Sequence, residues 1–200
     1  ITPQETDPAT SLRFLRARNL NAAKANAMFF EYLNWRNIER VDGILTETVD
    51  SNVAAVLAQS FAPRLLKGRD KLGRPILYIA LGGVDVPALE RKGVSIDDLI
   101  RCSIRSSEQV RLAVESSVDP LAGHLLINDL GLGTDNPCTA TKFITALRFW
   151  VAQGALGQNY YPEMLGHTCV IRGPPAAAWA VTQIKRFLDK KTADKIELTS

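Results

Sequence analysis

The chain has 200 residues, of which 46% are hydrophobic and 22% are charged, and its formal net charge is +3. This length suits one domain with a real hydrophobic core plus a small appendage. The weak positive charge excludes a dedicated nucleic-acid binder but allows a basic patch that faces an anionic membrane. The three cysteines, Cys102, Cys138 and Cys169, are widely spaced, which favours reduced thiols. No apolar run approaches the ~20 residues of a transmembrane helix and residues 1–8 show no signal-peptide pattern, so we expect a soluble chain.

The first 60 residues form the pattern of a helical unit. Ser11 is a candidate N-cap for a short helix, and Asn21 can cap a longer helix over residues 22–38. A weaker helix is predicted over 49–59. Three arginines of the short helix and its end, Arg13, Arg16 and Arg18, are predicted to lie on a solvated face. Helical spacing in 22–38 predicts a core-facing stripe made of Ala25, Met28, Phe29, Tyr32, Trp35 and Arg36.

From about residue 61 the pattern changes to strands that alternate with helices. The first strand, over residues 75–81, is almost continuously apolar, as expected when both faces of a sheet are covered. Alternation of this kind predicts an α/β fold with a largely parallel sheet. The further strands are predicted over 125–130, over 168–171 and from 196 onwards, and the helices over 96–114, 139–153 and 176–188.

The sequence offers little for catalysis. It contains only two histidines, and it has no GxSxG elbow and no cluster with metal-ligand spacing. The glycines of 129–135 suggest a phosphate loop, but the GxGxxG spacing is not met, and a strand-to-helix turn fits better. We therefore expect no catalytic residues, no metal site and no enzymatic activity.

Five strings resemble the CRAL-TRIO lipid-binding domain family, and the fungal-type phosphatidylinositol-transfer branch resembles this chain most. They keep the family's order along the chain. This resemblance implies a helical segment over 1–60 and a lipid-binding lobe over 61–200, with the C-terminal end of the lobe apparently missing. It also implies an apolar lipid pocket under a gate helix. The strings are SLRFLRARNLNAAKANAMFFEYLNWR (11–36), DKLGRPILYI (70–79), INDLGL (127–132), YYPE-x-x-G (160–166) and FLD-x-x-T-x-x-K-I (187–196).

The resemblance also implies a head-group site. In the phosphatidylinositol-transfer branch an inositol phosphate is held at positions that match Arg18, Glu163, Thr192 and Lys195 here. Arginine, lysine and threonine donate to phosphate, and a carboxylate accepts from ring hydroxyls. The family's lysine after the arginine is replaced by Asn19. A structural ion pair between Glu163 and Lys195 is the alternative.

A second-ligand pocket departs further from the family. Relatives that carry phosphatidylcholine have a serine and a threonine where this chain has His124 and Leu126. Leucine offers no hydroxyl to the lipid phosphate, so we expect poor phosphatidylcholine binding and another ligand, such as a sterol or a different small hydrophobe. Some relatives with a histidine here bind haem through a neighbouring tyrosine, which is absent. A hydrogen-bonded strand histidine is the remaining alternative.

The helix predicted over 176–188 is the candidate gate. Its apolar face would line the pocket when shut and touch the membrane when open, and Trp179 suits an interface. The lysines and arginine at its end, Lys185, Arg186, Lys190 and Lys191, would favour anionic lipid by ~1 kcal/mol each. An ordinary helix packed on a sheet is the alternative. The gate residues are Trp179, Val181, Ile184, Phe187 and Leu188.

Together these features predict a cytoplasmic carrier, peripheral on membranes, that exchanges phosphatidylinositol at anionic surfaces. Its ligand is a bound lipid, and no cofactor, metal or nucleic acid is expected. Two alternatives stay open. The first alternative to a phosphatidylinositol carrier is an interaction module that serves a protein partner in a larger assembly, and the second is a carrier of a sterol, tocopherol or retinoid.

Overall fold

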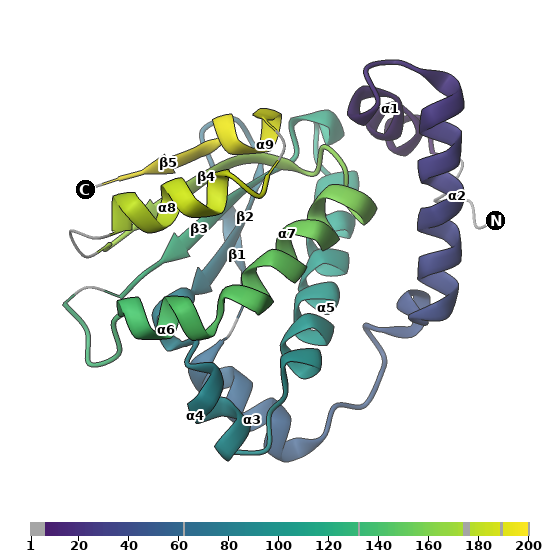
Figure 1. Cartoon of the computed structure of the whole chain (residues 1–200). Coiled ribbons are helices and arrows are strands. Elements are labelled where there is room, and N and C mark those ends of the chain that lie inside the picture. Colours follow the sequence, from purple (N-terminus) through teal and green to yellow (C-terminus); the bar gives the residue numbers. More distant parts are fainter. Residues whose placement is uncertain (1–6, 62, 132, 174–176, 189, 200) are drawn as a thin grey trace.

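The computed structural model describes residues 7–61, 63–131, 133–173, 177–188 and 190–199, and Figure 1 shows their arrangement. In chain order the elements are α1 (Pro8–Ala17), α2 (Ala22–Ile38), the 3-10 turn η2 (Val41–Gly43), α3 (Ser51–Ser60), β1 (Arg64–Arg69), β2 (Pro75–Ala80), η3 (Leu81–Gly83), α4 (Val86–Arg91), α5 (Ile96–Glu115), η4 (Pro120–Ala122), β3 (His124–Asp129), α6 (Ala140–Thr145), α7 (Leu147–Tyr160), β4 (Leu165–Ile171), α8 (Ala177–Lys185), α9 (Lys190–Asp194) and β5 (Ile196–Leu198).

The sheet places its strands in the order β1-β2-β3-β4-β5. The β1–β2 pair is antiparallel, and the other three pairs are parallel. Because parallel crossovers are right-handed, a sheet that grows in one direction puts its connecting helices on one face. Figure 1 shows α5, α6, α7 and α8 on that face. The predicted α/β fold with a mainly parallel sheet is confirmed.

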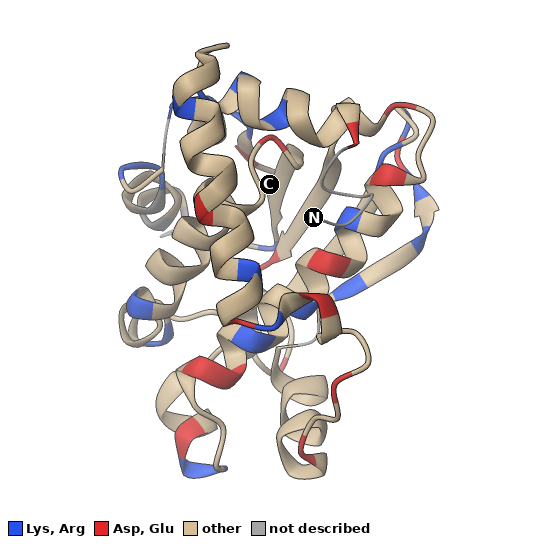
Figure 2. Cartoon of the chain, turned by 90° about the vertical axis from the view of Figure 1, so that its right-hand side faces the viewer, with Lys and Arg blue, Asp and Glu red and all other residues tan. Residues whose placement is uncertain are grey.

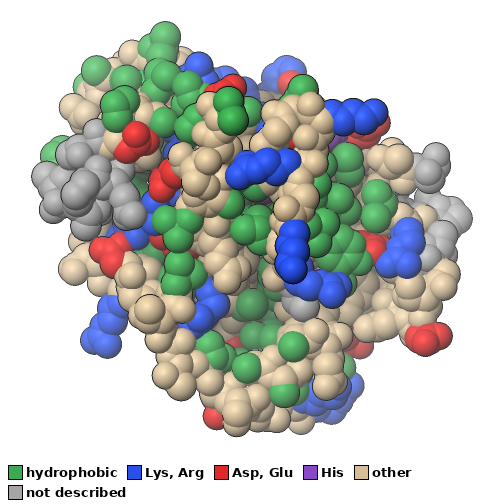
Figure 3. Space-filling model, turned by 180° about the vertical axis from the view of Figure 1, so that it is seen from behind, with side chains coloured by type: hydrophobic (Ala, Val, Ile, Leu, Met, Phe, Trp, Pro, Cys, Tyr) green, Lys and Arg blue, Asp and Glu red, His purple; other side chains and the backbone are tan. Residues whose placement is uncertain are grey.

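The other face of the sheet is less covered than the sequence suggested. Along β2, Leu77 and Ile79 are buried toward the helices, whereas Ile76 and Tyr78 on the opposite face are only half-buried. Seen from behind, hydrophobic side chains reach the surface among Lys and Arg side chains (Figure 3). The second face of this strand is therefore covered only in part.

Helix α2 has the predicted bounds, and the side chain of Asn21 caps it as expected. Helix α1 starts earlier than predicted, because Asp7 accepts a hydrogen bond from the Thr10 N–H at 2.9 Å and Pro8 occupies the first turn, where it needs no N–H partner. Ser11 therefore lies inside α1 and is not its cap.

The two N-terminal helices dock on the lobe through aromatic side chains. Trp35 of α2 stacks on Tyr160 at the end of α7, with ring centroids 4.2 Å apart and an interplanar angle of 6°. Figure 2 views the molecule from the right-hand side of Figure 1, and there α1 and α2 lie in front of the lobe, with basic and acidic residues interspersed. Stacked and offset aromatic pairs add about 1 kcal/mol beyond the area they bury. The cluster beneath α1 and α2 is formed by Phe14, Ala25, Met28 and Tyr32.

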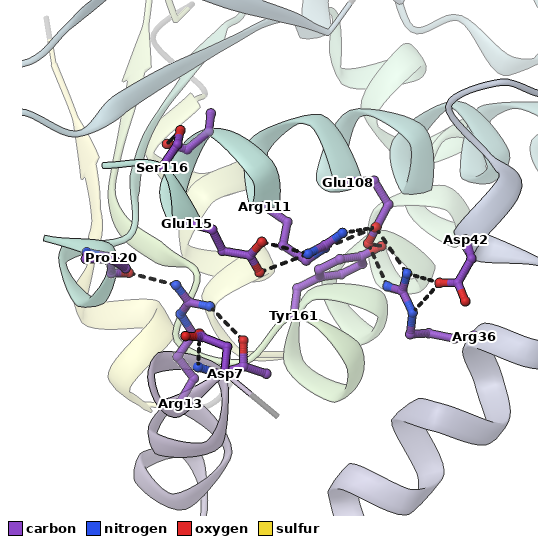
Figure 4. A network of polar contacts seen from close by, with 12 residues as sticks. Asp7, Arg13, Arg36, Asp42, Glu108, Arg111, Glu115, Ser116, Pro120 and Tyr161 are labelled. Atoms are coloured by element: carbon purple, nitrogen blue, oxygen red, sulfur yellow. Dashed lines mark hydrogen bonds and ion pairs between the residues drawn. The ribbon is translucent and has the colours of Figure 1, made fainter. Parts of the chain in front are cut away.

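A buried polar network joins the same two parts (Figure 4). The Glu108 carboxylate on α5 accepts hydrogen bonds from Arg36 at 3.0 Å, from Arg111 at 3.0 Å and from the Tyr161 hydroxyl at 2.9 Å. Arg36 also contacts Asp42. Burial alone would lower the pKa of Arg36, but the interactions with its partners outweigh burial and raise it. Buried charges are tolerated only when they are paired in this way.

Arg13 corrects the expectation of a solvated face. Its side chain is buried, with 3% exposed, and its Nη2 donates to the Pro120 carbonyl at 2.8 Å. Burial is the main cause that lowers the pKa of this guanidinium. Arg13 therefore belongs to the contact between α1 and η4, and periodicity within α1 could not reveal that partner 107 residues away.

Candidate ligand cavity

A cavity of about 650 Å³ lies between the sheet and the helices that cover it. This volume falls within the usual range for ligand-binding cavities. Because strands alternate their side chains between the two faces of a sheet, the covered face presents apolar side chains to the cavity. The facing helices contribute further apolar side chains. Its apolar wall includes Leu77, Ile79, Leu126 and Val170 from the strands and Phe143, Trp150, Val181 and Leu188 from the helical side.

The four residues predicted for the head group all line this cavity. The Lys195 Nζ lies 3.4 Å from Glu163 Oε2, and the side chains are 26% and 23% exposed. Arg18 follows the last residue of α1, and Thr192 lies in α9. Segments that are far apart in the sequence therefore bring charged side chains to one cavity, where they meet the apolar wall.

The backbone fixes these polar residues in different ways. Lys195 is held at the start of β5, since its carbonyl accepts the Thr168 N–H at 2.9 Å. Glu163 sits in the turn after α7 with a φ of 56°, in the left-handed region. That conformation costs a non-glycine residue roughly 1–2 kcal/mol, and such strain is found at functional sites. The ion pair between Glu163 and Lys195, which was the alternative to a head-group site, is present in the structure, and both of its members line the cavity.

His124 and Leu126 also line the cavity, from β3. The His124 Nδ1 lies 2.7 Å from the Met164 carbonyl, so Nδ1 carries the proton and donates. Burial, opposed by this hydrogen bond and reinforced by Arg74 and Lys195, lowers the pKa of His124 to about 4. The geometry matches the alternative of a hydrogen-bonded strand histidine.

Helix α8 covers part of the cavity, but it ends at Lys185, earlier than predicted. Trp179, Val181 and Leu188 line the cavity, and Trp179, 58% exposed, meets Phe143 of α6 with ring centroids 6.3 Å apart. Phe187 is equally exposed and lies outside the lining. The side chain of Ile184 lies outside the described residues.

Two lining features escaped the sequence interpretation. Lys190 and Lys191, expected to extend the gate helix toward the membrane, belong to the separate helix α9 and line the cavity.

On α7, Gly154 and Gly157 are one turn apart and also line the cavity. A side chain at Gly154 would meet Leu188, 3.2 Å from a Cβ placed there. The spacing of Gly154 and Gly157, at i and i+3 of a helix, was the sequence signal for this part of the cavity lining.

The described residues contain no group of three or more histidine, cysteine, aspartate or glutamate side chains placed to hold a metal ion. None of the helices described is both long enough and apolar enough to cross a membrane.

Comparison with known proteins defines the family. The CRAL/TRIO domain model matches residues 63–200. The chain belongs to the CRAL-TRIO domain family, as the sequence strings predicted, and fungal relatives support the fungal-type branch. The "Sec14 cytosolic factor" of Schizosaccharomyces pombe is 27% identical over 195 residues, which cover 98% of this chain and 67% of that protein.

Longer relatives match as well. "Protein real-time" of Anopheles gambiae is 31% identical over 195 residues, 96% of this chain, and the chain spans 27% of that protein's length. The "Phosphatidylinositol/phosphatidylcholine transfer protein SFH13" of Arabidopsis thaliana is 27% identical over 209 residues, with 99% of this chain and 32% of that protein covered. The crystal structure of Sfh5 shares the fold, with a TM-score of 0.76 at 16% identity, and covers 98% of this chain and 65% of that one.

Proposed function

We propose that the chain binds one molecule of phosphatidylinositol, holds its acyl chains in the cavity and exchanges it at the cytoplasmic surface of anionic membranes. The observation that carries this proposal is the shared location of Arg18, Glu163, Thr192 and Lys195, which line a cavity whose wall is otherwise mostly apolar. An amphiphile with a phosphorylated head group complements both parts of such a cavity. The name of the Arabidopsis relative supports the same class of ligand.

In this proposal each residue of the head-group site contacts a different part of the lipid or adds a different kind of contact. Arg18 and Lys195 donate to the phosphate, the Thr192 hydroxyl adds a further polar contact, and Glu163 accepts from ring hydroxyls. Helix α8 is the gate, since it presents Val181 to the cavity and exposes Trp179 at the surface. Burying each methylene of the lipid contributes about 0.8 kcal/mol, so only a closed apolar cavity can compete with the bilayer for the chains. No group of the protein has to react with the lipid.

Vesicle-to-vesicle transfer of fluorescent phosphatidylinositol tests this function. Lys195→Ala should lower the transfer rate roughly tenfold, because a hydrogen bond to a charged group contributes about 1.5–3 kcal/mol. Lys24→Ala removes the same charge from an exposed position on α2 and should leave the rate within twofold. Transfer of fluorescent phosphatidylcholine should be slower in the unmodified chain, since Leu126 offers no hydroxyl at the cavity wall.

Two results would count against this assignment. If Lys195→Ala transferred inositol lipid as fast as the unmodified chain, the head-group site would be elsewhere. If Lys24→Ala slowed transfer as much as Lys195→Ala, the loss would reflect general attraction to the vesicle and not a contact inside the cavity.

A further inference from the structure

Lys191 lines the charged part of the cavity wall, and 56% of its side chain is exposed. From α9 its Nζ donates to the Arg16 carbonyl at 3.0 Å and to Asn19 Oδ1 at 3.3 Å. The same Nζ lies 3.9 Å from Glu163 Oε1. Lys191 therefore connects the end of α1, the turn that holds Glu163 and the lining of the cavity.

Among the described residues that line the cavity around Lys191, the positive charges outnumber the negative ones. Arg18, Lys190, Lys191 and Lys195 line the cavity, and Glu163 is the carboxylate that faces them. Lys190 pairs with Asp194 at 2.6 Å, which leaves Arg18, Lys191 and Lys195 as three lining cations and Glu163 as the one described lining carboxylate. Glu163 itself is divided between Lys195 at 3.4 Å and Lys191 at 3.9 Å. An anionic ligand would balance this excess.

The Lys191 ammonium group donates a hydrogen bond to the side chain of Asn19. Asn19 has a φ of 51°, and asparagine tolerates the left-handed region better than most residues. An asparagine side chain carries no charge, yet an ammonium group lies 3.3 Å from its oxygen. The positive charge at this point of the wall thus comes from a different element, 172 residues further along the chain.

We propose that Lys191 is a third phosphate-binding cation of the head-group site, beside Arg18 and Lys195, and acts at the place where Asn19 carries no charge. This inference rests on the proposed function. In the structure the ammonium group donates to Arg16 and Asn19. In this proposal it donates to the head-group phosphate of a bound lipid together with Arg18 and Lys195. Both lysines can share one phosphate because each already lies within 4 Å of the same Glu163 carboxylate.

Equilibrium loading tests this role. The purified chain is titrated with phosphatidylcholine vesicles that contain phosphatidylinositol, and the bound inositol lipid is counted by native mass spectrometry. Lys191→Ala should weaken loading roughly tenfold, for the same reason as any lost charge-assisted hydrogen bond. Lys24→Ala is the control, because it removes the same charge from an exposed position on α2 that does not line the cavity, and it should load within twofold of the unmodified chain.

The double variant Asn19→Lys with Lys191→Ala separates charge from packing. It lacks the contacts of Lys191 with Arg16 and Asn19 but restores an ammonium group at the same place, so it should regain most of the loading. Normal loading of Lys191→Ala, or loading of the double variant as weak as that of Lys191→Ala, would overturn the role. If the unmodified chain loads no inositol lipid, the proposed function itself fails, and this result is recognised without any variant.

Discussion

His124 stands where β3, the turn after α7 and the cavity meet. Burial is the main cause that disfavours a positive charge on its ring, Arg74 and Lys195 add to this effect, and the hydrogen bond from Nδ1 to the Met164 carbonyl at 2.7 Å only partly opposes it. The folded chain therefore holds this histidine neutral, with a pKa of about 4, well below its ordinary value of 6.5. A neutral imidazole therefore adds no second positive charge beside Lys195.

This shift predicts a loss of stability in mild acid. Folding lowers the pKa of His124 from 6.5 to about 4. The contribution of this residue to the free energy of unfolding is therefore complete above pH 6.5 and is lost as the pH falls from 6.5 toward 4. The free energy of unfolding, measured with urea, should fall by about 2 kcal/mol between pH 7 and pH 5 from this group alone. His124→Asn keeps an N–H donor for Met164 but does not titrate, so its stability should fall less over the same range. An equal fall in both proteins would contradict the prediction.

At the residue scale, the sequence located the charged site only through the family strings. Arg18, Glu163, Thr192 and Lys195 follow no helical or strand periodicity, so their approach to one cavity depends on tertiary structure. Lys191 illustrates the limit. Its neighbours in the chain suggest a solvated or membrane-facing lysine, and its contact with Asn19 spans 172 residues. Buried Arg13 escaped prediction for the same reason.

At the scale of elements, the start of β4 depends on a glycine. His124 pairs with Leu165 and Leu125 pairs with His167, so Gly166 is the extra residue of a β-bulge. A Cβ at Gly166 would lie 2.3 Å from the Ala122 carbonyl oxygen, which is backbone and cannot move aside easily. The bulge sets the register that brings His124 and the turn with Glu163 together.

Gly166→Ala should therefore destabilise the chain by roughly 1–3 kcal/mol, in the range of overpacked sites. Gly68→Ala, in β1 of the same sheet, places its Cβ where no atom lies within 4 Å and should change stability by less than about 0.5 kcal/mol. Thermal and urea unfolding of the two variants give the comparison. Equal stabilities would show that the strand can shift to accept the methyl group.

Elements with a strong pattern were predictable, and those set by tertiary contacts were not. Helix α2 and strands β2 and β3 were found within a residue or two, because their apolar spacing is regular. Strand β1 was missed, since it is exposed along its length and carries Arg64, Lys67 and Arg69, the kind of residues that protect an edge strand. The predicted helix over 139–153 proved to be α6 and α7, which divide at Ala146, and α4 was not predicted.

At the scale of the whole molecule, the cavity belongs to both parts of the chain. The family match covers residues 63–200, whereas Arg18 and Asn19 of the lining precede it. The stack of Trp35 on Tyr160 and the hydrogen bonds of Arg36 to Glu108 hold α2 against the lobe that contains Glu163. The α1–α2 unit therefore completes the charged wall as well as covering the lobe.

The most direct test of the account exposes the purified chain to a total lipid extract of cells and identifies what it retains by native mass spectrometry. We expect one inositol phospholipid per chain, retained by the unmodified protein and largely lost from Lys195→Ala. Retention of a sterol, tocopherol or retinoid, or of no lipid at all, by the unmodified protein would contradict it.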